Sequence, residues 1–294
     1  MATRAQWLGA TRPRTLPAAV APVLVGSALA YDHGAFDWVL AMFAALVALA
    51  LQIGVNFAND YSDGIRGTDG VRVGPTRLVG RGLTSAVAMR RAAFGAFEAA
   101  ALAGLAIVFL TNNWWLVLVG LLAIVSAWSY TGGKNPYGYM GLGELFVFIW
   151  FGLVAVVGTL YIQTSSLTDW RGWALGAGSG ALSCALLVVN NLRDLPTDRD
   201  AGKRTLAVKL GDRATRSFYG ILLFIGMGSP LLLPLANGSV RLLDVLYVVP
   251  FLLAHVPGRK VLAGASGLDL LPILGDTGRI LLAWSLCVTA TLIF

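Results

Sequence analysis

The sequence predicts an all-α integral membrane protein. Its 294 residues are 57% hydrophobic and only 13% charged, whereas a soluble domain carries about 25% charged residues. Apolar stretches of helical length recur along the whole chain, without the alternating polar positions of a transmembrane β-barrel. The composition therefore excludes a water-soluble globule and a disordered chain, and it predicts a bundle of membrane-spanning helices.

Nine apolar ranges have the composition of membrane-spanning helices. In chain order they cover residues 16–30, 36–58, 88–110, 114–130, 141–162, 170–189, 217–235, 242–256 and 277–294. The first and the eighth are short and contain Pro17, Pro22 and Pro250. Both cysteines of the chain lie inside apolar ranges, so the sequence offers no disulfide framework or thiolate metal site. We treat residues 1–294 as a single membrane domain.

The basic side chains segregate to one side of this nine-helix arrangement. Of the 22 Lys and Arg residues, all except Arg171 and Arg241 fall in the N-terminal segment or in loops that follow even-numbered helices. The positive-inside rule then places the N-terminus and these loops in the cytoplasm and the C-terminus outside. Basic loops at a membrane surface also explain the net charge of +7. A nucleic-acid site would need a basic groove with stacking aromatic residues, and none is evident, so we expect no nucleic-acid partner.

Two acid-rich segments follow the second and the sixth predicted helix. On a helix, Asn56, Asp60 and Asp63 share one face through their i, i+4 and i+7 spacing. Residues 190–198 repeat the pattern with Asn190, Asp194 and Asp198. This recurrence is a faint sign of an internal repeat of residues 1–135 and 136–260, followed by a ninth helix over 277–294.

Facing sets of carboxylates need cations between them. At ~4 Å and an effective dielectric constant near 20, two carboxylates repel by about 4 kcal/mol. Oxygen ligands without His or Cys suit Mg²⁺, or Mn²⁺, and Mg²⁺ usually takes few carboxylates together with phosphate oxygens. Basic side chains interleaved with the acids would hold the remaining phosphate oxygens. These are Arg66, Arg72, Arg77, Lys203 and Arg204. The pattern predicts a diphosphate held at the membrane surface by Mg²⁺. For either motif alone, the alternative interpretation is that its acids are ordinary solvated loop residues.

These motifs resemble those of the UbiA superfamily of intramembrane aromatic prenyltransferases, and in particular its 1,4-dihydroxy-2-naphthoate branch. The first motif of the superfamily matches Asn59, Asp60 and Asp63, with a late third acid at Asp69. The second matches Asp194 and Asp198, which residues 202–206 (GKRTL) follow. Further stretches similar to the naphthoate branch are 12–16 (RPRTL), 22–24, 77–79 and 130–144.

The resemblance implies a nine-helix bundle whose site opens to the cytoplasm of a bacterial cell beneath a cap formed by the loops after helices 2 and 6. The implied reaction transfers a long-chain isoprenyl group from a polyprenyl diphosphate to 1,4-dihydroxy-2-naphthoate. Diphosphate and carbon dioxide leave, and the product is demethylmenaquinone. The expected Mg²⁺ ligands are Asp60, Asp63, Asp69, Asp194, Asp198 and Asp200. The asparagines that orient ligands or phosphate are Asn56, Asn59 and Asn190.

Lys134 is the only basic residue in the short loop between the fourth and fifth predicted helices, with Tyr130, Tyr137 and Tyr139 nearby. The resemblance implies that Lys134 pairs with the carboxylate of the aromatic acid. One tyrosine, for which we choose Tyr130, would orient or deprotonate a ring hydroxyl. The alternative is an interfacial aromatic belt with one lysine that sets orientation.

Three other functions remain open on the sequence alone. A related prenyltransferase would use another acceptor, such as 4-hydroxybenzoate, homogentisate, a glycerol phosphate or a phosphoribose donor system. A cation-coupled transporter would also carry acids at broken helices, although such sites tend to lie near the bilayer midplane. A membrane scaffold gives no reason for two matched acid motifs.

Overall fold

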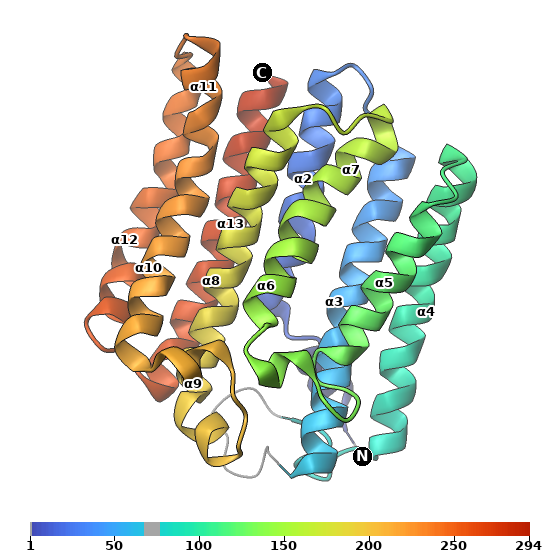
Figure 1. The fold of residues 1–294 in the computed structure, drawn as a ribbon, viewed down its shortest axis with the longest axis vertical. Helices are drawn as coiled ribbons and strands as arrows, with labels where there is room; N and C mark the ends of the chain where they lie inside the picture. The colour runs from blue at the N-terminus through green and yellow to red at the C-terminus, as the bar shows by residue number, and fades with distance from the viewer. Residues whose placement is uncertain (1, 68–76) are drawn as a thin grey trace.

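A computed structural model describes residues 2–67 and 77–294 of the chain. The described part is a bundle of upright helices without β-strands (Figure 1). The α-helices are α1 Arg4–Ala10, α2 Pro17–Asp32, α3 Trp38–Arg66, α4 Ala86–Thr111, α5 Leu116–Ser129, α6 Gly143–Phe148, α7 Ala155–Thr164, α8 Trp170–Asp200, α9 Leu206–Leu210, α10 Asp212–Gly228, α11 Leu232–Asn237, α12 Val248–Leu262 and α13 Leu270–Ile293. A π-helical segment, Ile149–Val154, joins α6 to α7 in one continuous span.

The predicted all-helical membrane class is confirmed, but the count of nine spans is not. Each of the nine predicted ranges falls on helix, and seven helices of the described chain are long and apolar enough to cross a membrane. An eighth span results if α1 and α2 count together, although they are bent by 52°. Pro13 and Pro17 lie at this bend, where proline ends a regular helix. Helix α5 has only 14 residues and is shorter than a full span.

Helix α8 is the centre of the bundle, because 78% of its apolar window is buried, against 50% or less in the other candidate spans. Glycines on two faces of α8 let its neighbours approach closely. A Cβ atom added to Gly152 of the π-helical segment would lie 2.5 Å from the Cα atom of Gly180 on α8. A Cβ atom on Gly226 of α10 would lie 3.0 Å from the carbonyl oxygen of Gly178. These contacts place α8 between the π-helical segment and α10.

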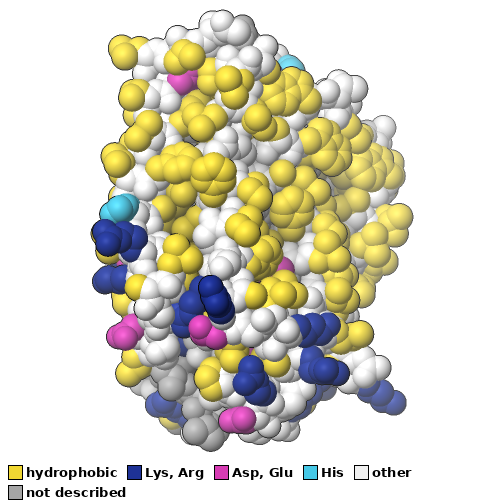
Figure 2. All heavy atoms as spheres, turned by 60° about the vertical axis from the view of Figure 1, so that its left-hand side comes forward, with side chains coloured by type: hydrophobic (Ala, Val, Ile, Leu, Met, Phe, Trp, Pro, Cys, Tyr) yellow, Lys and Arg dark blue, Asp and Glu magenta, His cyan; other side chains and the backbone are white. Residues whose placement is uncertain are grey.

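The two ends of the bundle differ in charge. The N-terminus and the ends of α3 and α8 that carry the acid motifs lie at one end, and the C-terminus lies at the other (Figure 1). Figure 2 shows Lys and Arg side chains over the lower part of one face and hydrophobic side chains above them. At the opposite end, Arg171 pairs with Asp32 at 2.7 Å and with Asp169 at 3.0 Å. This basic residue, at the end opposite the acid motifs, therefore ties α2 to the start of α8.

We expect Gly152→Ala to lower the melting temperature in detergent by several degrees, because its Cβ atom would collide with backbone atoms of α8. The free energy of unfolding should fall by about 1–3 kcal/mol, the usual cost of overpacking. Gly158→Ala is the matched control in the same span, since nothing lies within 4 Å of its added Cβ atom. Tryptophan fluorescence during heating measures both variants. Equal melting temperatures for the two would contradict backbone packing at Gly152.

Candidate active site

A cavity of about 340 Å³ lies between α2, α3, α4, α5, the span from α6 to α7, and α8. Its polar end is lined by Asp63 of α3 and by Asp194 and Asp198 of α8. Its other end is lined by apolar side chains, including Ile107 and Ile162. The cavity therefore joins a charged mouth to an apolar interior.

Asp63 lies at the centre of the charged mouth and is only 3% exposed. Its Oδ1 atom accepts a hydrogen bond from Lys203 Nζ at 3.0 Å and another from the Tyr139 hydroxyl. Its Oδ2 atom accepts from Arg77 Nη2 at 3.1 Å. Lys203 Nζ also lies 3.7 Å from Asp198 Oδ1. One ammonium group thus connects the two acid motifs, which are far apart in the sequence.

Asp194 is held by a residue that sequence reasoning missed. Arg193 donates through Nε and Nη2 to the two carboxylate oxygens, each at 2.7 Å, and Nη2 also donates to Asn190 Oδ1 at 2.9 Å. Both side chains of the pair are buried. Adjacent residues on a helix do not normally face each other, so spacing alone gave no reason to pair them. A buried charge needs a partner, and that requirement was the available signal.

Asp60, one of the expected Mg²⁺ ligands, is buried but does not line the cavity. Its two carboxylate oxygens accept hydrogen bonds from the backbone N–H groups of Leu78 and Val79, at 2.8 and 3.0 Å. These bonds hold the segment that begins at Arg77, whose side chain does line the cavity. The contacts of Asp60 therefore position Arg77.

The other predicted site residues divide into two groups. Those that line the cavity are Asn56, Asn59, Arg77, Tyr130, Tyr137, Tyr139, Asn190 and Lys203. Those that are exposed and outside the lining are Arg66, Lys134, Asp200 and Arg204. Arg66 donates to the carbonyl groups of Thr131 and Gly133 and so holds the loop after α5. Asp69 and Arg72 lie outside the described residues.

Aromatic side chains form one wall of the cavity beyond the charged mouth. Tyr137 stacks on Phe146 with a centroid distance of 4.0 Å, and Tyr130 meets Tyr137 edge-on at 5.5 Å. Burial raises the pKa of Tyr137, and burial together with the charge of Asp63 raises the pKa of Tyr139. Both therefore stay protonated at neutral pH and can donate hydrogen bonds but not act as bases.

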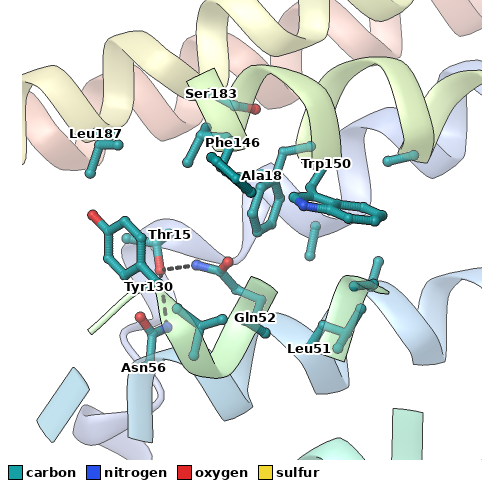
Figure 3. Close-up of a pocket in the computed structure, with 18 of the residues that line it drawn as sticks. Thr15, Ala18, Leu51, Gln52, Asn56, Tyr130, Phe146, Trp150, Ser183 and Leu187 are labelled. Carbon is teal, nitrogen blue, oxygen red and sulfur yellow. Dashed lines mark hydrogen bonds between the residues drawn. The ribbon is translucent and has the colours of Figure 1, made fainter. Parts of the chain in front are cut away.

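A second residue missed by sequence reasoning is Gln52, which lines the cavity on α3 and is 7% exposed. Its Nε2 atom donates to Thr15 Oγ1 at 2.9 Å, and Asn56 reaches the same hydroxyl at 3.4 Å (Figure 3). The signal in the sequence was a lone amide inside an apolar run, where a buried polar group needs a partner.

The oxygen donors at the mouth have the chemistry of a Mg²⁺ site. Asp63, Asp194 and Asp198 line one cavity, with the amide side chains of Asn59 and Asn190 beside them. Within the described ranges, no three His, Cys, Asp or Glu side chains are close enough to hold a metal by themselves. The carboxylate and amide oxygens that line the mouth suit Mg²⁺, which usually binds few protein groups and completes its coordination with water and phosphate oxygens.

The fold matches those of two archaeal proteins. A UbiA homolog from Aeropyrum pernix K1 superposes with a TM-score of 0.72 over 95% of this chain and 96% of its own, at 15% identity. A UbiA homolog from Archaeoglobus fulgidus bound to DMAPP and Mg²⁺ superposes with a TM-score of 0.66 over 97% and 99% of the two chains, also at 15% identity. These likenesses concern the fold.

A bacterial relative is much more similar in sequence. The 1,4-dihydroxy-2-naphthoate octaprenyltransferase of Mycobacterium tuberculosis is 49% identical over 100% of this chain and 99% of its own length. Residues 19–262 match the UbiA prenyltransferase family as a whole. Together with the all-helical fold and the paired acid motifs, these findings show that the chain belongs to the UbiA prenyltransferase family.

Proposed function

We propose that the protein transfers a polyprenyl group from its diphosphate to 1,4-dihydroxy-2-naphthoate, with loss of diphosphate and carbon dioxide, to give demethylmenaquinol, which oxidation by air converts to demethylmenaquinone. The observation that carries this proposal is the cavity, which joins a mouth of acids and basic side chains to an apolar interior. A polyprenyl diphosphate has the same two-part chemistry. The name of the Mycobacterium tuberculosis relative, which matches over the full length, supports the naphthoate as acceptor.

The diphosphate is assigned to the charged mouth. Asp63, Asp194 and Asp198 would hold Mg²⁺ there, and the Archaeoglobus fulgidus homolog with DMAPP and Mg²⁺ supports a metal-bound diphosphate. Bound Mg²⁺ would stabilise the negative charge that develops on the leaving diphosphate. Lys203 and Arg77, which contact Asp63, are placed to hold phosphate oxygens. Mn²⁺ has similar ligand preferences, and we propose it as a substitute.

The acceptor is assigned to the aromatic wall next to the mouth. Arg12 lines the cavity whereas Lys134 is exposed outside it, so we assign the carboxylate of the acceptor to Arg12. Tyr130 and Tyr137 offer ring faces and hydroxyl donors for an aromatic substrate. The loop that carries Lys134 is held by Arg66.

The chain's own residues then protect and direct the reaction. The allylic C–O bond breaks toward the diphosphate, and the apolar walls exclude water from the allylic cation. The ring carbon that bears the carboxylate bonds to the cation, and the carboxylate leaves as carbon dioxide. The electron pair of the broken bond between the ring and the carboxylate restores the aromatic ring. The product therefore leaves as the hydroquinone. This step needs no base, which agrees with tyrosines that remain protonated.

We further propose that the end with the acid motifs faces the cytoplasm beneath a cap formed by the loops after α3 and α8, of which residues 68–76 lie outside the described part of the chain. The concentration of Lys and Arg side chains toward this end supports the orientation (Figure 2). The N-terminus lies at the same end and the C-terminus at the other (Figure 1). Both substrates would then enter from the cytoplasmic side.

A product assay tests the proposed function. We expect purified protein with Mg²⁺, octaprenyl diphosphate and 1,4-dihydroxy-2-naphthoate to form demethylmenaquinone, detected in the lipid extract by mass spectrometry. EDTA should abolish the product and added Mg²⁺ or Mn²⁺ should restore it, since the acids need a cation to hold the diphosphate. A prenylated product from 4-hydroxybenzoate alone would reject the naphthoate. No product with any acceptor would reject prenyl transfer.

We expect Asp63→Asn to lower kcat by at least about 100-fold, because it removes a charge that both Mg²⁺ and Lys203 need. Glu98→Gln is the matched control: it removes one carboxylate charge from α4, where the side chain is exposed and outside the cavity. Demethylmenaquinone formation by the two variants, both checked for folding by size-exclusion chromatography, measures the difference. Near-normal turnover by Asp63→Asn would contradict the assignment of the mouth.

The apolar half of the cavity is assigned to the prenyl tail. Gly158 lines it with nothing within 4 Å of an added Cβ atom, so a larger side chain there would fill the cavity without displacing its neighbours. We expect Gly158→Leu to lower kcat/KM about 10-fold or more for a C40 donor but little for a C10 donor. Gly95→Leu is the control, on an exposed part of α4 outside the cavity lining. Its kcat/KM should equal that of the native protein for both donors. Equal losses for both chain lengths would place the tail elsewhere.

A further inference from the structure

Gln52 brings an amide into a part of the cavity whose other walls are mainly apolar. It lies on α3 about three turns before Asp63, roughly 16 Å away along the helix axis. Phe146 and Trp150, from the span opposite, face the same space (Figure 3). This distance from the charged mouth is too long for contact with the diphosphate. The amide therefore requires another explanation.

The hydrogen bonds around Thr15 determine which atom of the amide faces the cavity. The Thr15 hydroxyl donates to the carbonyl oxygen of Arg12 at 3.0 Å, so toward Gln52 it can only accept. Gln52 must therefore turn its NH₂ group to Thr15, as observed at 2.9 Å. The Oε1 atom consequently points away from Thr15 and toward the cavity (Figure 3).

Asn56, one turn further along α3, reinforces this arrangement. Its NH₂ group donates to the carbonyl oxygen of Thr11 at 2.8 Å and approaches Thr15 Oγ1 at 3.4 Å. Both amides thus direct their donors to the segment before α2. Within the described chain, no protein group donates a hydrogen bond to Gln52 Oε1. Gln52 lines the cavity, so a ligand that fills this space displaces water from Oε1. An acceptor that loses water without gaining another donor is costly, so the ligand should supply one.

We propose that Gln52 Oε1 accepts a hydrogen bond from a ring hydroxyl of the aromatic acceptor and thereby selects the hydroxyl-bearing, reduced ring. The inference rests on the proposed function and adds a specificity-determining residue to it. Phe146 and Trp150 provide the flat apolar surroundings that a bicyclic ring fills. A quinone carbonyl at the same place could not donate a hydrogen bond, and its oxygen would repel Oε1 because both atoms are acceptors. The protein would therefore discriminate against the oxidised form of its own product.

Gln52→Leu tests the proposal, because leucine keeps most of the volume and removes the acceptor atom. Three probes are used: 1,4-dihydroxy-2-naphthoate, 1-hydroxy-2-naphthoate and 4-hydroxy-2-naphthoate, each with Mg²⁺ and with inorganic diphosphate in place of the donor. For each probe, the association constant of the variant is divided by that of the native protein, so that the reactivity of the ring does not enter. We expect this ratio to fall about 10- to 100-fold for the dihydroxy probe and to stay near one for the monohydroxy probe that lacks the recognised hydroxyl.

The outcomes separate the inference from the function on which it rests. An equal ratio for all three probes, whether reduced or near one, would overturn the role of Gln52 while leaving prenyl transfer intact. Absence of product from the native protein with every naphthoate would overturn the proposed function, and the inference with it. Gln52→Asn keeps the amide but shortens the side chain; it serves if the leucine variant fails to fold, and it should show the same dependence on the hydroxyl.

Discussion

Among the residues that the structure describes, the two acid motifs meet at one ammonium group, that of Lys203, and the site depends on it. Asp63 at the end of α3 and Asp198 at the end of α8 both approach Lys203, and Asp63 is nearly inaccessible to solvent. Two buried carboxylates from separate helices would repel each other without this ammonium group. Arg193 serves Asp194 in the same way. The basic side chains among the acids thus hold the mouth together, and they are also suited to bind a phosphate ligand.

That arrangement is possible because α8 lies in the middle of the bundle. Its glycines allow the π-helical segment on one side and α10 on the other to approach at backbone distance. The cavity is bordered by α3 and α5 on the far side, where side chains rather than backbones face the space. Close packing of α8 against these two neighbours thus fixes the helix whose other residues, such as Asn190 and Asp194, line the cavity.

Runs of apolar residues predicted the helices. Spacing predicted the two acid motifs, because it determines which face of a helix a residue occupies. It could not identify partners. Asp60 shares a face with Asn56 in sequence, yet its oxygens are taken by the amides of Leu78 and Val79. Spacing also could not predict that Lys134 is exposed, because the path of its loop depends on tertiary contacts such as those of Arg66. Gln52 was overlooked because its signal, a lone amide in an apolar run, shows that a partner is needed but not which one.

The π-helical segment Ile149–Val154 has a consequence for how this cavity can change over evolution. Such a segment holds one residue more than an α-helix of the same extent, and Ser179 of α8 donates to the carbonyl oxygen of Phe151 within it. Loss of one residue here would restore an α-helix of the same extent, so Phe146 and Gly158 on either side would keep their places at the cavity. Trp150, Phe151 and Val154, which line the cavity from the segment itself, would shift instead. A single deletion can therefore remodel this wall of the cavity and leave the charged mouth unaltered.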